Sequence, residues 1–186
     1  MSEKRPIPTD LVEDKLVAWN PSDGSMLYRL GFYGKPVGIP KPKTFDFDTP
    51  LNIDLIEGLY LLEKGIIEVS TMEGKKLSTR ALRRVARKMH EGFDHQYLVY
   101  KDLREHGYVV LTGIKFGCEF AVYEHGPGVD HAPYLVSVKA SDDEVSSIDL
   151  VRAGRLATTV KKRFIIAIPN LKTKKVQYLI FKWQKL

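Results

Sequence analysis

The chain has 186 residues, which allows one large domain or two small ones, and we expect two. Its 29 Lys and Arg residues exceed its 23 Asp and Glu residues, and the formal net charge of +6 favours a polyanionic partner. A single cysteine excludes an internal disulfide and a multi-cysteine zinc site, and no segment resembles a signal peptide or a membrane span. We therefore expect a cytoplasmic protein that does not associate with a membrane.

The first fifty residues alternate short apolar runs with Gly and Pro, which predicts short strands joined by turns. Helical periodicity through Ile53 then predicts a helix over 52–65, with Gly65 as its left-handed cap. Ser78 is an N-cap candidate for a second helix. The polar side of that helix is basic, with Arg83, Arg84, Arg87 and Lys88. A third helix is expected over 95–107.

Residues 108–140 are rich in β-branched and aromatic types around a Gly-Pro-Gly turn, which predicts an antiparallel meander. An amphipathic helix is expected over 145–162, followed by two final strands. The fold class is therefore α/β, in the α+β sense. We expect a small N-terminal α/β domain over 1–92 and a C-terminal mixed-sheet domain over 93–186.

Three residues of the C-terminal half can together cleave RNA without a metal or a cofactor. Attack by a ribose 2′-hydroxyl on the adjacent phosphate needs a base, an acid and a cation. His131, in the loop after the Gly-Pro-Gly turn, titrates near neutrality and is the best single candidate. Tyr123 ends a strand and needs a nearby cation to act as a base; otherwise its phenol orients the nucleophile.

The cation comes from a basic run between the expected helix and the next strand, where Lys161 and Lys162 remain nearly equal alternatives. Without a catalytic role, His131 would be an ordinary surface histidine, Tyr123 a half-buried strand residue, and the two lysines part of a solvated basic edge. From Val151 to the end the chain has many Lys and Arg residues and no Asp or Glu, which concentrates positive charge beside these candidates.

The segments 97–138 and 146–168 closely resemble the catalytic module of archaeal tRNA-splicing endonucleases, and 55–65 resembles a helix of that family's N-terminal domain. The resemblance implies a metal-independent endonuclease without a cofactor. Its substrate would be precursor tRNA with a bulge-helix-bulge, and its products a 2′,3′-cyclic phosphate and a 5′-hydroxyl. We expect no membrane partner.

By position, the family's tyrosine, histidine and lysine fall on Tyr123, His131 and Lys162, which favours Lys162 over Lys161. The resemblance assigns the base to the tyrosine, the acid to the histidine and the transition-state charge to the lysine. Arg155 matches a family arginine that grips a bulged base, and Trp183 is the candidate for the opposite side of that grip. A core position in the last strand is an equal alternative for Trp183.

Two loops bear on partners. Self-assembling members dock an acidic loop between the last two strands into a neighbouring subunit, whereas here residues 170–175 are basic, and like charges repel. We therefore expect a catalytic subunit of an α2β2 heterotetramer with a non-catalytic endonuclease subunit. The loop over 35–43 resembles an insertion that reaches RNA through Lys41 and Lys43; a solvated connecting loop is the equal alternative.

Two other functions remain as alternatives. The first alternative is a non-catalytic, RNA-binding structural subunit of the same assembly. The presence of all three matched residues favours the enzyme over this subunit. More distant is an unrelated basic α/β domain with a metal-dependent nuclease site. The carboxylates of Asp142, Asp143 and Glu144 are clustered but occupy an expected turn, so we predict no metal.

Overall fold

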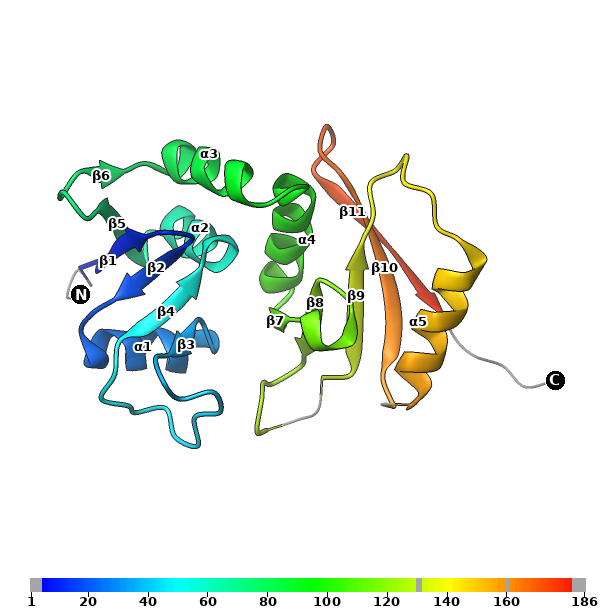
Figure 1. Cartoon of the computed structure of the whole chain (residues 1–186), viewed down its shortest axis with the longest axis horizontal. Helices are drawn as coiled ribbons and strands as arrows, with labels where there is room; N and C mark the ends of the chain where they lie inside the picture. The colour runs from blue at the N-terminus through cyan, green and yellow to red at the C-terminus, as the bar shows by residue number, and fades with distance from the viewer. Residues whose placement is uncertain (1–4, 130–131, 160, 182–186) are drawn as a thin grey trace. The chain divides into compact units, whose positions relative to one another are not determined.

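The computed structural model of the chain describes residues 5–129, 132–159 and 161–181. Its contacts divide the chain into two compact units, Met1–Phe93 and Asp94–Leu186. Each unit contains one mixed sheet with helices packed against it (Figure 1). In the described part of the chain, no helix is long and apolar enough to cross a membrane.

The sheet of the N-terminal unit has the strand order β3-β4-β2-β1-β5-β6. Strands β1 and β5 are parallel, and the other neighbours are antiparallel. The strands are β1 (Ile7–Val12), β2 (Lys15–Ala18), β3 (Lys35–Pro36), β4 (Leu51–Asp54), β5 (Ile67–Thr71) and β6 (Lys76–Leu77).

The expectation of strands and turns alone before residue 50 is wrong, because Pro21–Gly31 forms helix α1. Asn20 caps this helix, since its side-chain oxygen accepts a hydrogen bond from the Ser22 N–H, and Pro21 occupies the first turn, where no N–H is needed. Leu27 and Tyr28 bury one side of α1 in the core of the unit. The Gly and Pro residues that resembled turn signals therefore begin and end a helix.

Helix α2 (Leu55–Glu63) confirms the helix expected from periodicity, but it begins later than expected. Ile53 belongs to β4, where it pairs with Leu16 of β2. Gly65 adopts a φ of +67° just beyond the helix, as expected for a left-handed cap. At Gly58 the helix approaches β2 so closely that an added Cβ would lie 2.3 Å from Leu16 Cδ1.

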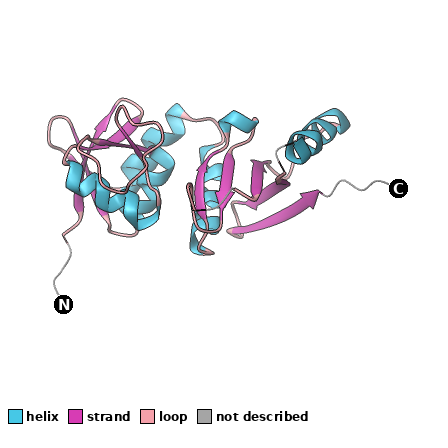
Figure 2. Ribbon diagram, turned by 90° about the horizontal axis from the view of Figure 1, so that it is seen from below, coloured by secondary structure: helices cyan, strands magenta, loops and turns pink. Residues whose placement is uncertain are grey.

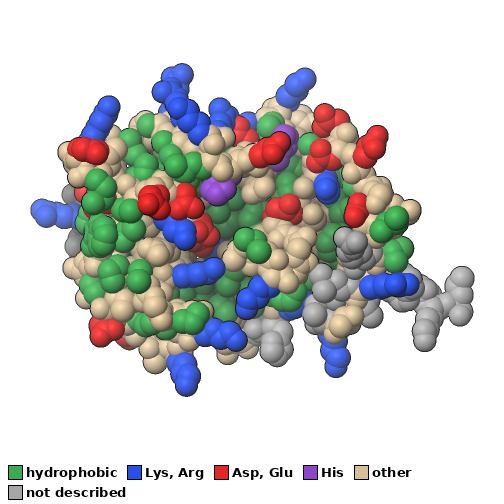
Figure 3. Space-filling view, in the orientation of Figure 1, with side chains coloured by type: hydrophobic (Ala, Val, Ile, Leu, Met, Phe, Trp, Pro, Cys, Tyr) green, Lys and Arg blue, Asp and Glu red, His purple; other side chains and the backbone are tan. Residues whose placement is uncertain are grey.

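Helix α3 (Thr79–Met89) confirms the expected basic helix and packs on α2. Ser78 is its N-cap, and the Ser78 hydroxyl accepts a hydrogen bond from the Ala81 N–H at 3.2 Å. Leu82 and Ala86 are buried. Lys and Arg side chains project along the edge where α3 lies (Figure 3).

The sheet of the C-terminal unit has the strand order β11-β10-β9-β8-β7. The expected meander is confirmed, because β7, β8 and β9 pair antiparallel, whereas β9 and β10 are parallel and require a crossover. The strands are β7 (Val109–Thr112), β8 (Phe120–Tyr123), β9 (Tyr134–Val138), β10 (Arg163–Asn170) and β11 (Lys175–Phe181).

Helices α4 (Phe93–Glu105) and α5 (Ser147–Thr159) cover opposite faces of this sheet (Figures 1 and 2). Helix α5 makes the crossover between β9 and β10. Helix α4 is fixed to the edge strand β11, because the Tyr178 hydroxyl donates a 2.6 Å hydrogen bond to the Asp102 carboxylate. Burial and then the Asp102 carboxylate raise the pKa of Tyr178, so this phenol keeps its proton.

Candidate active site at the start of β9

The strand register brings three chain segments together at one edge of the C-terminal sheet. Tyr134, the first residue of β9, pairs with Val122 of β8 on one side and with Arg163 of β10 on the other. Because β8 runs antiparallel to β9 and β10 runs parallel to it, β8 ends where β9 and β10 begin. Tyr123 and Lys162, the neighbours of these paired residues, therefore flank the residues that lead into β9.

Lys162 is attached to the segment that precedes β9. Its Nζ donates a 2.5 Å hydrogen bond to the carbonyl oxygen of Ala132, and the Arg163 N–H donates to the Pro133 carbonyl at 2.8 Å. Lys161, by contrast, is exposed and has a φ of +54°. Of the two adjacent lysines, Lys162 is thus the one that is half-buried and directed at the chain immediately after position 131.

Tyr123 is half-buried and packs, with Phe116 and Phe164, on a small apolar cluster. The buried members of that cluster are Cys118, Ala121, Ala132 and Leu135. The same cluster therefore supports the tyrosine of β8 and the segment bound by Lys162. An apolar floor beneath a cation lowers the local dielectric constant and strengthens its attraction for an anion.

Phe116 is a site residue that the sequence analysis did not identify. It closes a 3₁₀ turn, η1 (Ile114–Phe116), and the ammonium of Lys162 lies 5.6 Å from the centroid of its ring. Gly117 ends the turn in the left-handed region, with a φ of +67°. Phe116 lies within the segment 97–138 that carries the family resemblance, and its ring contributes a cation–π contact that fixes the direction of the lysine.

The lone cysteine belongs to the support of the site and not to its chemistry. Burial, and next the neighbouring Glu119 carboxylate, raise the pKa of the Cys118 thiol to about 11. The thiol donates instead to backbone carbonyls of Gly113 and Phe120, at 3.6 and 3.4 Å. A protonated, buried thiol is a poor nucleophile.

Two expected site residues, His131 and Trp183, lie outside the residues that the structure describes. Arg155 is described and is exposed on α5. It lines a surface hollow of about 420 Å³ together with Ser147, Ile148 and Val151. A guanidinium beside exposed apolar side chains is a surface on which a flat base can stack.

Lys41 and Lys43 lie in the N-terminal unit, in the β3–β4 loop (residues 37–50), and both are exposed. The two ends of the loop are held together, because the Val37 N–H donates to the Pro50 carbonyl at 2.9 Å. Just before the loop, the Gly34 N–H donates a 3.0 Å hydrogen bond to the buried Glu57 carboxylate. The entry to the loop is therefore fixed to α2.

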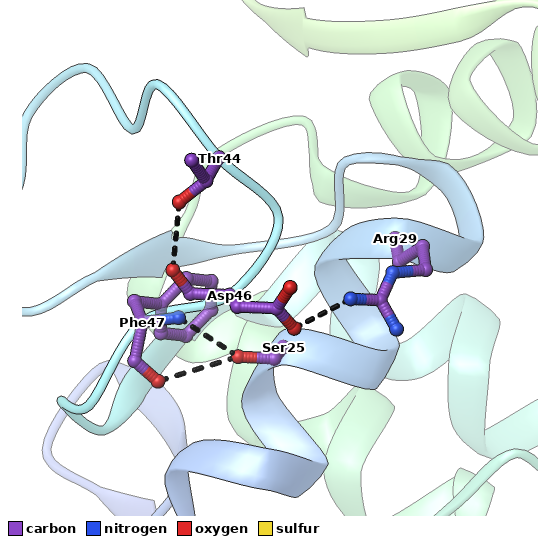
Figure 4. Close-up of polar contacts among 5 residues, drawn as sticks. All are labelled: Ser25, Arg29, Thr44, Asp46 and Phe47. Carbon is purple, nitrogen blue, oxygen red and sulfur yellow. Dashed lines mark hydrogen bonds and ion pairs between the residues drawn. The ribbon is translucent and has the colours of Figure 1, made fainter.

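The second half of the loop is fixed to α1 (Figure 4). The buried hydroxyl of Ser25 donates to the Phe47 carbonyl at 3.3 Å and accepts from the Phe47 N–H at 3.2 Å. Arg29 pairs with Asp46, whose carbonyl accepts a hydrogen bond from Thr44. Between these fixed ends, the loop presents its two lysines to solvent.

Aromatic packing adds to this attachment. The ring of Tyr28 lies 6.0 Å from that of Phe45 and 5.9 Å from that of Phe47, and Phe32 lies 5.4 Å from Phe45. Gly24 allows the close approach, since an added Cβ would lie 2.9 Å from Leu51 Cβ and 3.3 Å from the Phe47 ring. Edge-on and tilted contacts of this kind stabilise beyond their buried area.

The acidic cluster that suggested a metal site forms a turn. The Asp143 carboxylate accepts a 2.7 Å hydrogen bond from the Ala140 N–H, and Asp142 and Glu144 are exposed. Across residues 5–129, 132–159 and 161–181, no three His, Cys, Asp or Glu side chains are grouped so that they can hold a metal ion. The turn hydrogen bond accounts for the position of Asp143.

The edge strand β11 of the C-terminal sheet exposes apolar side chains, and the turn that joins it to β10 is basic. Leu179, Ile180 and Phe181 of the edge strand β11 are exposed, at 50%, 57% and 36%. The turn before β11 is tight, because Asn170 Oδ1 accepts from the N–H groups of Lys172 and Thr173, both at 3.0 Å. An exposed apolar edge strand is a surface that pairs readily with another chain.

Comparison with known proteins shows relatives over most of the chain. The family described as "tRNA intron endonuclease, catalytic C-terminal domain" matches residues 93–178, and "tRNA intron endonuclease, N-terminal domain" matches residues 7–83. A protein named tRNA-splicing endonuclease from Hyperthermus butylicus is 49% identical over 159 residues, 86% of this chain and 88% of that protein. Proteins of the same name are 42% identical in Sulfurisphaera tokodaii, over 95% of this chain and 98% of that protein, and 41% identical in Saccharolobus islandicus, over 95% and 97%.

Proposed function

Because the chain belongs to the tRNA intron endonuclease family, we propose that it is a catalytic subunit that cuts precursor tRNA at a bulge-helix-bulge. The cut leaves a 2′,3′-cyclic phosphate and a 5′-hydroxyl and needs no metal ion. The observation that supports this proposal most is that Tyr123 and Lys162 lie at the same edge of the sheet, on either side of the segment that follows position 131.

In the proposed reaction, the ribose 2′-oxygen attacks the adjacent phosphorus while its proton leaves to a base. Tyr123 takes this proton or orients the hydroxyl, and a neighbouring positive charge favours the phenolate that the first role requires. His131 donates a proton to the departing 5′-oxygen as the P–O bond breaks. Imidazole suits this role because it titrates near neutrality.

Lys162 supplies the positive charge for the phosphorane-like intermediate, in which negative charge accumulates on the non-bridging oxygens. Its direction is fixed before any substrate binds, by the Ala132 carbonyl and the ring of Phe116. A charge held in place needs little reorganisation during the reaction, and this is the source of its catalytic value.

Substrate binding is proposed for both units. Arg155 stacks on a base turned out of the bulge, on the hollow it shares with Ile148 and Val151, and Trp183 forms the second side of this grip. Lys41 and Lys43 contact RNA phosphates from the β3–β4 loop, which the contacts to α1 hold in one shape. A loop ordered in advance loses less conformational entropy on binding.

The subunit works in an α2β2 heterotetramer with a non-catalytic endonuclease subunit. The exposed apolar residues of β11 support an interface along this edge of the sheet. The basic turn at Lys172 and Lys174 supports a different partner from a second copy of the chain, because two such turns repel and an acidic partner surface attracts them.

The test uses the chain co-expressed with its non-catalytic partner and a bulge-helix-bulge precursor tRNA, with EDTA present. We expect cleavage with cyclic phosphate ends in the wild type, and a loss of at least about 100-fold in His131→Ala, as for removal of a general acid. His125→Ala is the matched control and should cut normally. Binding without cleavage by the wild type would instead indicate a non-catalytic RNA-binding subunit, and full activity in His131→Ala would exclude the histidine as the acid.

A further inference from the structure

Helix α3 has two faces of opposite character, and only one of them is explained by the fold. Leu82 and Ala86 are fully buried where the helix packs on α2. On the other face Arg80, Arg84 and Lys88 follow one another at intervals of four residues, and all three are exposed. We call these three residues the α3 stripe.

The α3 stripe is unfavourable for the helix itself. Residues four apart on a helix are neighbours, so Arg84 lies between two like charges. Arg80 is in the first turn, where the helix dipole disfavours a cation, whereas Lys88 is in the last turn, where the dipole favours one. The helix contains no Asp or Glu to compensate. A surface helix that served only stability would alternate charges of both signs.

Neighbouring residues do not neutralise the stripe either. Among the residues that the structure describes, no carboxylate forms an ion pair with Arg80, Arg84 or Lys88. Close by, Lys76 of β6 is paired with Glu68 of β5 at 2.7 Å. Acidic side chains are thus present in this unit, but none of the described ones is paired with the stripe.

The spacing fits a line of phosphates. A helix rises 1.5 Å per residue, so the three cations lie about 6 Å apart along the axis. Such a row of long cationic side chains can follow the repeating negative charges of one nucleic-acid strand. No large apolar side chain is exposed between Arg80 and Lys88, whereas a stable protein interface has an apolar centre.

We propose that the α3 stripe binds the sugar–phosphate backbone of the RNA, as a second contact surface that acts on affinity and not on chemistry. The proposal rests on the proposed function for the identity of the RNA, a precursor tRNA. Contacts of this kind are independent of sequence, position the RNA and are strongly weakened by salt.

The experiment compares the wild type with the triple variant Arg80→Gln/Arg84→Gln/Lys88→Gln, each assembled with the partner subunit. Glutamine retains high helix propensity, so the helix is preserved. Binding of a precursor tRNA with 2′-deoxyribose at the cleavage positions is titrated over a range of salt. The slope of log K against log salt should fall in magnitude by about two to three, since each phosphate contact contributes roughly 0.7–0.9.

A matched control removes the same charge elsewhere, with Arg5→Gln/Lys15→Gln/Lys139→Gln on three different parts of the chain. Its slope should stay near that of the wild type. The single-turnover rate of the stripe variant at saturating protein should also stay within about twofold, because the contacts are made equally in the ground state and the transition state.

Two results would overturn the proposal. An unchanged salt slope in the stripe variant would show that the stripe is a solvated face. In the second case, light scattering would show that less of the stripe variant assembles into the heterotetramer, while the assembled fraction binds RNA as tightly as the wild type. That result would assign the stripe to a protein partner. Because the deoxy substrate is not cut, the slopes decide the question even if the wild type has no cleavage activity.

Discussion

The ammonium group of Lys162 donates a hydrogen bond to the backbone carbonyl of Ala132 across 30 positions of sequence. The contact links the start of β10 to the segment that enters β9, next to position 131. The cation and the expected acid are therefore attached to the same short stretch of backbone. Lys161 is exposed, so the two adjacent lysines have different surroundings and differ in what their loss should cost.

Replacement of Lys162 by Gln should lower single-turnover cleavage by about 100- to 1,000-fold, as found when one group that stabilises a developing negative charge is removed. RNA affinity should change much less, because one phosphate contact among many contributes little to binding. Lys161→Gln is the matched control, with a rate within about threefold of the wild type. Equal losses in the two variants would mean that only the local net charge matters.

Replacement of Ser25 by Ala should release the second half of the β3–β4 loop. The change removes both hydrogen bonds to the half-buried Phe47 backbone, each worth about 0.5–1.5 kcal/mol. Trypsin should then cut faster after Lys43, the tryptic site of this loop, because the bond after Lys41 precedes Pro42 and resists the protease. Cleavage of a relaxed, single-bulge RNA should fall as it does in Lys41→Ala/Lys43→Ala, while the full bulge-helix-bulge is cut normally.

Ser22→Ala is the control for this loop, because Ser22 is on the same helix but exposed. It should leave tryptic cutting and substrate range unchanged. Faster proteolysis of Ser25→Ala without any change in substrate range would show that the loop is ordered but has no role in RNA selection.

Alkaline pH should destabilise the fold through Cys118. Its folded-state pKa of about 11 lies above the value of about 8.5 in an unfolded chain, so the folded chain holds the proton more tightly. The stabilisation is complete below about pH 8.5 and is lost as the pH rises towards 11. Guanidinium unfolding should therefore show a falling free energy over this interval, and a smaller fall in Cys118→Ala.

Tyr178 acts in the same direction at higher pH, since its pKa is also raised, so part of the fall should persist in Cys118→Ala. Alkylation provides an independent measurement. At about pH 8 the native thiol should react with iodoacetamide more than about 100-fold slower than the unfolded chain, because so little thiolate is present. Rapid alkylation of the native protein would contradict a buried, protonated thiol.

Two glycines in helices should respond oppositely to alanine. At Gly58 the new methyl group would overlap the side chain of Leu16, and we expect a loss of about 1–3 kcal/mol. At Gly154 of α5, no atom of the described residues outside the local helix backbone lies within 4 Å of the added Cβ, and the lower entropy of the unfolded chain should stabilise the protein by about 0.5–1 kcal/mol. Denaturant unfolding of both variants gives the comparison.

Much of the fold could be predicted because local signals and tertiary structure agree. Ser78 marks the start of α3, Gly65 follows α2, and the alternation of apolar residues gives the strands of the meander. Helix α1 was missed because Pro21 and Gly24 resemble turn residues. In the structure Pro21 begins the helix and Gly24 allows the β3–β4 loop to approach it, and neither role is visible without the tertiary contacts.

The candidate site could be predicted only as a set of residue types. Whether Tyr123 and Lys162 lie at the same edge of the sheet depends on the pairing of β9 with both β8 and β10, and strand order is a long-range property. Phe116 was missed because its contact with Lys162 joins two segments with no local pattern in common. The roles of His131, Trp183 and Arg155 remain predictions, as do those of Lys41 and Lys43.

The parallel pairing of β9 with β10 determines when a growing or refolding chain first brings Lys162 beside the start of β9. The meander of β7, β8 and β9 can form from neighbouring sequence, but the lysine arrives only after helix α5 has crossed the sheet and β10 has paired beside β9. A half-folded molecule thus has the phenol without the ammonium. Under the proposed mechanism, an incompletely folded chain therefore lacks a complete site until β10 has paired with β9.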